Sequence, residues 1–200
     1  MSYSQYAEEE HILHALEGVQ GVFLDVGAWH PKVFSNTRAL YELGWSGIFI
    51  EPSPGCMLNL LAEYGKDNRA VLIQAAVASE AGLLPLHVSR DAVSTTSEVQ
   101  YKAWENHAEF EGVVYVPVLT FRYIFERFGG AFEFINIDTE GTSVDLFADL
   151  LSIGPRPRCI CVEHDGRIVE ANQFAEKAHY RQVHCNGTNL IFEWTGKREK

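Results

Sequence analysis

Several features of other protein classes are missing from this sequence. No apolar run approaches the roughly 20 residues that a membrane-spanning helix needs. The N-terminal residues contain neither the basic start nor the apolar stretch of a secretory signal peptide. No internal repeat or low-complexity segment is visible. We therefore expect a globular, cytoplasmic protein with no membrane partner.

Positive charge and cysteine are also scarce. Lysine and arginine number 16 against 27 acidic residues, which gives a net charge of -11. This charge repels the phosphates of nucleic acids and anionic lipids, so neither is expected as a partner. The four cysteines form no C-x-x-C pair, and we expect reduced, buried thiols. His11 and His14 could share a helix face but lack a nearby third ligand, so we predict no metal.

The 200 residues suffice for one well-buried domain, which we expect to span residues 1–200. Apolar runs at 22–26, 48–51 and 70–76 predict buried strands, and the sequence between them has helical spacing. Alternating strands and helices favour an α/β fold with a parallel sheet. Further strands are expected at 132–137, 158–162, 182–185 and 189–194, and helices at 5–17, 35–43, 54–64, 120–128, 142–151 and 168–178.

This regularity is interrupted between two alternating segments, 84–88 and 113–118, which predict edge or hairpin strands. Residues 89–112 between them are polar and are interpreted as an insertion. Its polar and aromatic side chains could grip a substrate or form a lid, and an ordinary surface excursion is the alternative. Residues 196–200 (GKREK) are expected to form a loose tail.

Polar residues at the ends of the first two predicted strands indicate a ligand site. In an open parallel sheet, ligands bind outside the carboxyl ends of the strands. The first strand ends in Asp25-Val26-Gly27-Ala28, where Gly27 permits a sharp turn close to a ligand. The second ends in Glu51, which follows Gly27 by 24 residues, near the ~20 expected for an acid that binds ribose hydroxyls.

The glycines of a pyrophosphate-binding loop are absent. Gly27 is followed by Ala28, Trp29, His30 and Pro31 rather than by the further glycines of G-x-G-x-x-G. This weakens the interpretation as a nicotinamide-dependent oxidoreductase. One glycine turn with a ribose-binding acid suits a nucleoside ligand without phosphates, of which S-adenosylmethionine is the commonest.

Three segments, in this order, resemble the FkbM-type branch of the class I methyltransferases. They are FLDVGAWHPKVFSNTRALYELGWSGIFIEPSP at 23–54, AAVAS at 75–79 and INIDTEG at 135–141. The resemblance implies a Rossmann-like, mostly parallel seven-stranded sheet with an antiparallel last strand and helices on both faces. It also implies methyl transfer from S-adenosylmethionine to a hydroxyl of a small molecule, sugar or secondary metabolite.

The resemblance also assigns roles to individual residues. It implies that Asp25, Gly27 and Ala28 lie beside the methionine part of the cofactor. Ser35 would lie near the cofactor carboxylate, and Glu51 with Pro52 would hold the ribose. Gln74, Ala75 and Ala76 would flank the adenine, while Asp138, Glu140 and Gly141 would line the floor where donor and acceptor meet. The sequence departs from the family at Trp29, His30 and Pro31, where an Asn and a further Gly are common.

A hydroxyl acceptor must lose its proton during methyl transfer, and a base within hydrogen-bond reach accelerates that step by roughly 10²- to 10⁴-fold. The candidates are Asp138, Glu140, His30 and His164. Asp138 is the first choice because it ends a strand beside the expected donor. It could instead hold the cofactor ammonium, in which case a histidine would be the base.

The expected partner is a small-molecule or glycan acceptor, and a homodimer is left open. Two other functions remain as alternatives. A non-catalytic binding module would bind S-adenosylmethionine without consuming it, and a nicotinamide-dependent oxidoreductase would bind NADH.

Overall fold

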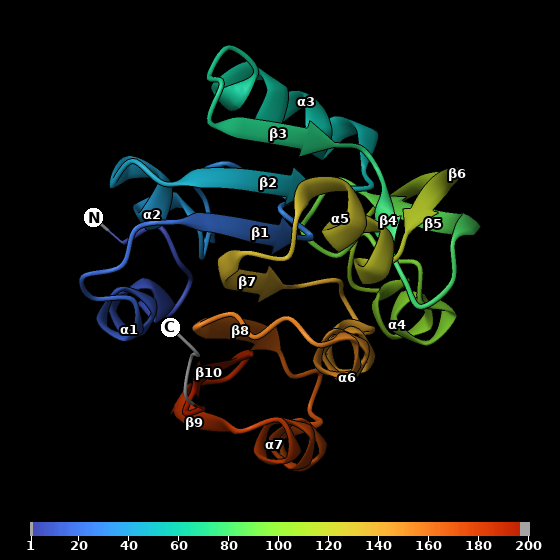
Figure 1. Ribbon diagram of the computed structural model, residues 1–200. Helices are drawn as coiled ribbons and strands as arrows, with labels where there is room; N and C mark the ends of the chain where they lie inside the picture. The colour runs from blue at the N-terminus through green and yellow to red at the C-terminus, as the bar shows by residue number, and fades with distance from the viewer. Residues whose placement is uncertain (1, 197–200) are drawn as a thin grey trace.

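The computed structural model describes residues 2–196, which form a large sheet with helices on both faces and a smaller sheet at one end (Figure 1). Of the predicted tail, only Gly196 lies within the described residues. The helices are α1 (Glu8–Ala15), α2 (Arg38–Glu42), α3 (Pro54–Tyr64), α4 (Glu98–Trp104), α5 (Phe121–Phe128), α6 (Ser143–Ile153) and α7 (Ile168–Lys177). The strands are β1 (Val22–Val26), β2 (Ser46–Ile50), β3 (Ala70–Ile73), β4 (Ala76–Val77), β5 (Gly82–Ser89), β6 (Phe110–Leu119), β7 (Phe132–Ile137), β8 (Cys159–Glu163), β9 (Tyr180–Cys185) and β10 (Asn189–Trp194). None of these helices is long and apolar enough to cross a membrane.

The large sheet confirms the predicted fold class. Its seven strands run in the order β3-β2-β1-β7-β8-β10-β9. The pairs from β3 to β8 are all parallel, whereas β10 is antiparallel to both β8 and β9. The chain places β3 and β2 on one side of β1 and returns to the other side with β7, so the strand order reverses between β1 and β7. This reversal is where an α/β sheet opens a crevice for a ligand.

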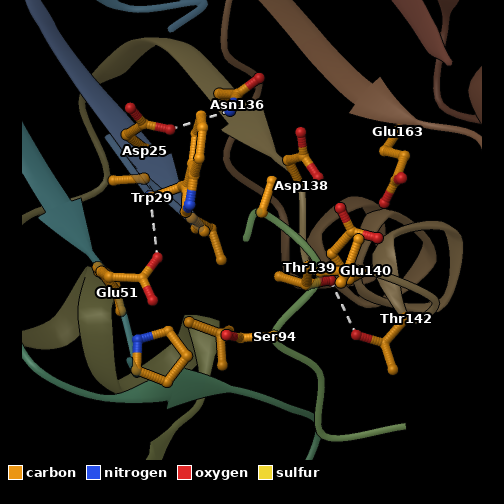
Figure 2. Close-up of a pocket in the computed structure, with 18 of the residues that line it drawn as sticks. Asp25, Trp29, Glu51, Ser94, Asn136, Asp138, Thr139, Glu140, Thr142 and Glu163 are labelled. Carbon is orange, nitrogen blue, oxygen red and sulfur yellow. Dashed lines mark hydrogen bonds between the residues drawn. The ribbon is translucent and has the colours of Figure 1, made fainter. Parts of the chain in front are cut away.

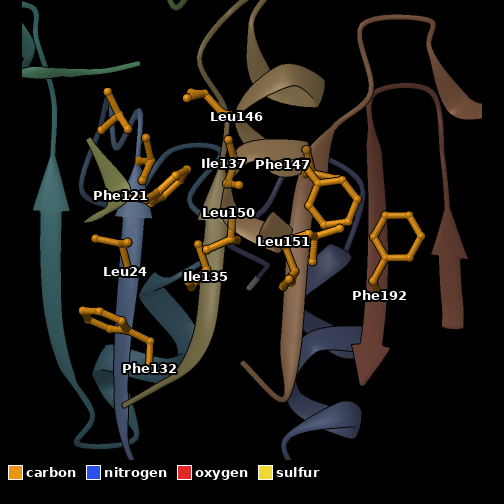
Figure 3. Packing of buried hydrophobic residues seen from close by; sticks show 14 of the residues in the cluster. Leu24, Phe121, Phe132, Ile135, Ile137, Leu146, Phe147, Leu150, Leu151 and Phe192 are labelled. Atoms are coloured by element: carbon orange, nitrogen blue, oxygen red, sulfur yellow. The ribbon is translucent and has the colours of Figure 1, made fainter. Parts of the chain in front are cut away.

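Helices cover both faces of the sheet, so both faces are buried. Neighbouring residues of each strand point to opposite faces and therefore pack into different helical layers. In β1, Leu24 packs into the layer that contains α5, α6 and α7, while Phe23 packs into the layer that contains α1, α2 and α3. Figure 3 shows part of the first layer, where Phe121 and Phe147 meet the apolar residues of the central strands. Cys159 and Cys161 belong to the second layer, whereas Cys185 is exposed, contrary to the expectation of buried thiols.

The third predicted strand is too long, because the chain leaves the large sheet at Ile73. Residues Ala76–Val77 form β4, which pairs with the end of β6 in a second sheet of order β4-β6-β5. The two alternating segments are confirmed as an antiparallel pair, β5 and β6. Part of the predicted insertion forms the helix α4. The Ser97 side chain caps the start of this helix by accepting a hydrogen bond from the Gln100 backbone N–H.

The turn after β1 is packed against the end of β7 so closely that only glycine fits. Gly27 has φ +81°, and a Cβ there would lie 1.6 Å from the backbone oxygen of Asp138. The Asp138 N–H donates to the Val26 oxygen at 2.9 Å, and the Gly27 N–H donates to the Ile50 oxygen at 2.9 Å. The ends of β1, β2 and β7 are therefore bonded together at this turn.

We predict that Gly27→Ala lowers the free energy of unfolding by at least about 2 kcal/mol, because it combines backbone strain with a clash. Gly55→Ala is the matched control, since Gly55 lies in α3 with nothing within 4 Å of an added Cβ. Urea unfolding of both variants measures the difference. Equal losses in the two variants would contradict the close approach at Gly27.

Candidate active site

A cavity of about 340 Å³ lies at the carboxyl ends of β1, β2, β7 and β8. Its wall includes the turn after β1, the start of β10, β4, and residues 92–94 of the segment before α4. The volume falls within the roughly 300–1,000 Å³ typical of small-molecule sites. The cavity therefore occupies the place where the reversal of strand order predicts a ligand crevice.

Glu51 is held in a fixed orientation on one side of this cavity. The Trp29 N–H donates to Oε2 at 2.9 Å (Figure 2). The Ser53 N–H donates to Oε1 at 2.7 Å. The residue is 5% exposed, and burial raises the pKa of its carboxyl to about 7, although the two N–H donors act in the opposite direction. Each oxygen accepts one of these bonds and keeps lone-pair capacity for a ligand hydroxyl. The Gly27 turn and Glu51 thus form one continuous wall.

Asp25 lies deeper and holds a chain of polar side chains together. Its two oxygens accept hydrogen bonds from the Thr37 hydroxyl at 2.6 Å and from the Asn136 amide at 2.9 Å. The oxygen of Asn136 in turn accepts a bond from the Asn36 amide at 3.1 Å. Burial raises the pKa of Asp25 to about 6, against the effect of these donors. Asp25 thus fixes the orientation of the Thr37 hydroxyl and the Asn136 amide.

Three carboxylates gather on the opposite side of the cavity from Glu51. Figure 2 shows Asp138, Glu140 and Glu163 there, and one oxygen of each lies within 4.8 Å of the others. Burial raises the pKa of Asp138 to about 7 and of Glu140 to about 8, and it raises the pKa of Glu163 well above its ordinary value. Repulsion from Asp138 adds to this effect at Glu140 and Glu163, whereas a hydrogen bond with Glu163 acts in the opposite direction at Asp138. Within the described part of the chain, this is the one group of acidic, histidine or cysteine side chains spaced to hold a metal ion.

The segment before and within α4 is fastened to the loop that carries Glu140. The Thr95 hydroxyl donates to the Glu140 backbone oxygen at 2.6 Å, and the Gln100 amide donates to its carboxylate at 3.2 Å. Glu140 has φ +53°, a left-handed conformation that costs energy unless neighbours hold it. Ser94, Gln100 and Trp104 line the cavity. The insertion therefore contributes to the cavity wall, as a substrate-gripping segment or lid would.

The cavity brings together most of the residues predicted from sequence. Ten of them line it, namely Asp25, Gly27, Ala28, Ser35, Glu51, Pro52, Ala75, Ala76, Asp138 and Glu140. His30, His164, Gln74 and Gly141 are not among the lining residues. Gln74 is exposed at the end of β3.

The two histidines named as candidate bases are engaged in local turns. His30 Nδ1 accepts hydrogen bonds from the backbone N–H groups of Lys32 and Val33. His164 Nδ1 accepts a bond from the Gly166 N–H at 3.0 Å, and its Nε2 lies 3.3 Å from the Asn186 oxygen. His30 thus bonds the backbone of its own loop, whereas His164 also contacts the loop between β9 and β10, and neither ring lines the cavity.

Sequence reasoning missed several polar residues of the cavity, among them Glu163, Asn36 and Asn136. Glu163 ends β8 as Asp138 follows β7, so the rule of examining strand ends could have found it. Asn36 and Asn136 gave no such signal, because 100 positions separate them and only the fold joins them.

The sequence from residue 25 to residue 187 matches the family model of the methyltransferase FkbM domain. The chain belongs to the FkbM methyltransferase family. This membership and the fold support a methyltransferase function. None of the curated proteins matches the chain.

Two solved structures resemble this FkbM domain. The crystal structure of the methyltransferase FkbM from Methylobacillus flagellatus aligns with a TM-score of 0.55 at 12% identity, covering 88% of this chain and 44% of that protein. This chain therefore spans less than half the length of that relative. The fibrillarin pre-rRNA processing protein of Methanococcus jannaschii aligns with a TM-score of 0.44 at 11% identity, covering 89% of this chain and 68% of that one. At such identities the first likeness shows a shared fold.

The raised pKa values predict how stability depends on pH. A carboxyl whose pKa is higher in the folded state contributes stability at low pH and loses it as the pH rises through that pKa. We expect Glu163→Gln to exceed the parent protein in unfolding free energy by more than about 1 kcal/mol at pH 8, and by little at pH 5. Urea unfolding at both pH values, with the exposed Glu126→Gln as control, measures this. The same difference at both pH values would contradict the expected repulsion.

Proposed function

We propose that this chain binds S-adenosylmethionine and transfers its methyl group to a hydroxyl of a small molecule, sugar or secondary metabolite. The observation that carries the proposal is the hydrogen bond from the Trp29 N–H to Glu51, 2.9 Å long, which fixes the ribose-binding candidate beside the glycine turn. The FkbM family and the open cavity at the strand ends support the same conclusion.

The residues of the cavity fit the proposed cofactor. Gly27 and the small Ala28 both line the cavity, so a ligand can approach the backbone of this turn without meeting a bulky side chain. Glu51 can accept ribose hydroxyls through the lone pairs that its two N–H donors leave free. Ala75 and Ala76 offer an apolar wall for adenine. When bound, the cofactor supplies a methyl group already activated on a sulfonium.

The protein must therefore mainly hold the acceptor oxygen in line with the methyl group and remove its proton. Burial raises the pKa of Asp138 above its ordinary value and toward neutrality. A carboxylate with a raised pKa is a stronger base than an exposed aspartate, which suits a general base. Glu140 is the second candidate within the cavity, and the alternative role of Asp138 is to hold the cofactor ammonium. With both histidines engaged in turns, we favour a carboxylate over a histidine as the base.

We predict that Glu51→Gln weakens S-adenosylmethionine binding by roughly 10- to 100-fold, the equivalent of about 1.5 to 3 kcal/mol for a hydrogen bond to a charged group. Isothermal titration calorimetry measures the affinity, with Glu126→Gln as the surface control. A parallel titration with NADH tests the oxidoreductase alternative. Unchanged affinity in Glu51→Gln would remove the ribose assignment.

We predict that Asp138→Asn lowers kcat by about 100-fold or more while the cofactor affinity stays within a factor of about two, because a base acts on the transition state. Methyl transfer over a panel of hydroxylated compounds supplies kcat, and calorimetry supplies the affinity. A loss of affinity instead would assign Asp138 to the cofactor ammonium. Full activity would exclude it from both roles, and cofactor binding without any transfer by the parent protein would favour the non-catalytic alternative.

A further inference from the structure

Residues 3–7, which we call the N-terminal segment, belong to the wall of the cavity. The family match begins only at residue 25, yet Gln5 is one of the residues that line the cavity. The Ser35 N–H donates to the Tyr3 oxygen at 3.1 Å, and this bond joins the N-terminal segment to the loop before α2. The cavity is therefore completed by residues that precede the matched domain.

Buried carboxylates at the start of α1 hold the N-terminal segment in place. Glu9 is 9% exposed, and its Oε2 accepts hydrogen bonds from the N–H groups of Tyr3 at 2.8 Å and Ser4 at 3.4 Å. The Ser4 hydroxyl accepts a bond from the Glu9 N–H at 3.2 Å. Beyond Gln5, the next N–H donates to the fully buried Glu8 at 2.8 Å. The backbone around Gln5 is therefore fixed, although its own side chain is exposed.

The proposed cofactor carries a carboxylate as well as an ammonium and a sulfonium. The acidic side chains of the cavity suit the two cations, but they repel the carboxylate. Among the described residues that line the cavity, none is lysine, arginine or histidine. Uncharged N–H or O–H groups must therefore bind this carboxylate.

Ser35, which the resemblance places near this carboxylate, has its donors engaged within the chain. Its N–H bonds to the N-terminal segment. Its Oγ accepts a bond from the Arg38 N–H at 3.1 Å and lies 3.3 Å from the Thr37 hydroxyl oxygen. Because the Thr37 hydroxyl donates to Asp25, the hydrogen between Ser35 and Thr37 comes from Ser35. Ser35 thus has no hydrogen left for the cofactor.

Five side-chain amides line the cavity, and Gln5 alone among them has no hydrogen-bond partner in the described part of the chain. The amide nitrogen of each of the others donates to another side chain, namely in Asn36, Gln100, Asn136 and Asn189. The Gln5 nitrogen therefore remains available to a ligand. It also belongs to the segment that is bonded to Ser35.

We propose that the side-chain amide of Gln5 donates a hydrogen bond to the carboxylate of S-adenosylmethionine, so that the N-terminal segment completes the cofactor site. This inference rests on the proposed function and adds to it a cofactor-binding residue from outside the matched domain. Glu8 and Glu9 act as positioning residues, because they hold the backbone on both sides of Gln5.

The test compares S-adenosylmethionine with its decarboxylated analogue, which keeps the sulfonium and the ammonium and lacks only the carboxylate. Isothermal titration calorimetry at neutral pH gives both affinities, and their ratio measures the preference for the carboxylate. We expect Gln5→Ala to reduce this preference about tenfold, as the loss of one hydrogen bond to a charged group does, with little change in the binding of the analogue. Gln5→Glu is expected to reduce the preference further, because its charge repels the carboxylate.

Gln20→Ala is the matched control, because Gln20 is also an exposed glutamine and precedes β1 at the opposite end of the sheet from the cavity. It is expected to leave both affinities unchanged. An unchanged preference in Gln5→Ala would overturn the proposal, and so would an equal loss for both ligands. A preference that rises in Gln5→Glu would assign Gln5 to the ammonium and contradict the proposal as well.

Gln5→Lys separates a contact with the carboxylate from a general effect of substitution. This variant is expected to keep or increase the preference, because its ammonium attracts the carboxylate. A loss as large as that of Gln5→Ala would contradict the contact. Failure of the parent protein to bind either ligand would remove the proposed function together with the assignment of Gln5. Binding by the parent with an unchanged ratio in Gln5→Ala would overturn that assignment alone, so the two failures are distinguishable.

Discussion

The contact between Gly27 and the backbone of Asp138 constrains the whole cavity. A side chain at residue 27 would occupy the position of the Asp138 oxygen, so the ends of β1 and β7 can meet only where glycine stands. The same turn bonds to the end of β2 through the Ile50 oxygen and through the side chain of Glu51. One residue without a side chain therefore joins the ribose-binding candidate to the strand that carries the candidate base.

Buried negative charge is the second constraint. The fold brings five carboxylates to one cavity and supplies no lysine, arginine or histidine from the described residues to its wall. Burial raises the pKa of these groups, most of all on the side of Glu140 and Glu163. Stability lost through such repulsion is regained when a cation binds, so the cost of the empty cavity becomes selectivity for a positively charged ligand. A sulfonium cofactor suits this environment.

Much of the fold follows from local patterns, whereas the limits of the sheets do not. The strands Phe132–Ile137 and Asn189–Trp194 were predicted residue for residue, since continuous apolar runs between turn residues mark them clearly. The run from 70 to 76 is equally apolar, yet it leaves one sheet at Ile73 and enters another at Ala76. Only tertiary pairing with β6 decides that change. Helix α4 has no buried residue, so its sequence lacks the apolar stripe from which a helix is usually predicted.

In the candidate site, too, some residues can be predicted from local sequence, whereas others depend on the tertiary structure. Gly27 and Glu51 could be found from sequence because their spacing follows from strand and helix lengths. His30 and His164 were candidate bases because histidine often serves as one. In the structure, Nδ1 of each ring accepts hydrogen bonds from a backbone turn. The amide chain from Asp25 to Asn36 depends on side chains that meet only after the sheet has formed.

A crystal structure of the protein with S-adenosylhomocysteine tests the central claim most directly. The account predicts ribose hydroxyls within hydrogen-bond distance of the Glu51 carboxylate, with the backbone of Gly27 in contact with the same ligand molecule. An adenosyl group bound elsewhere, or bound without contact to Glu51, would contradict it.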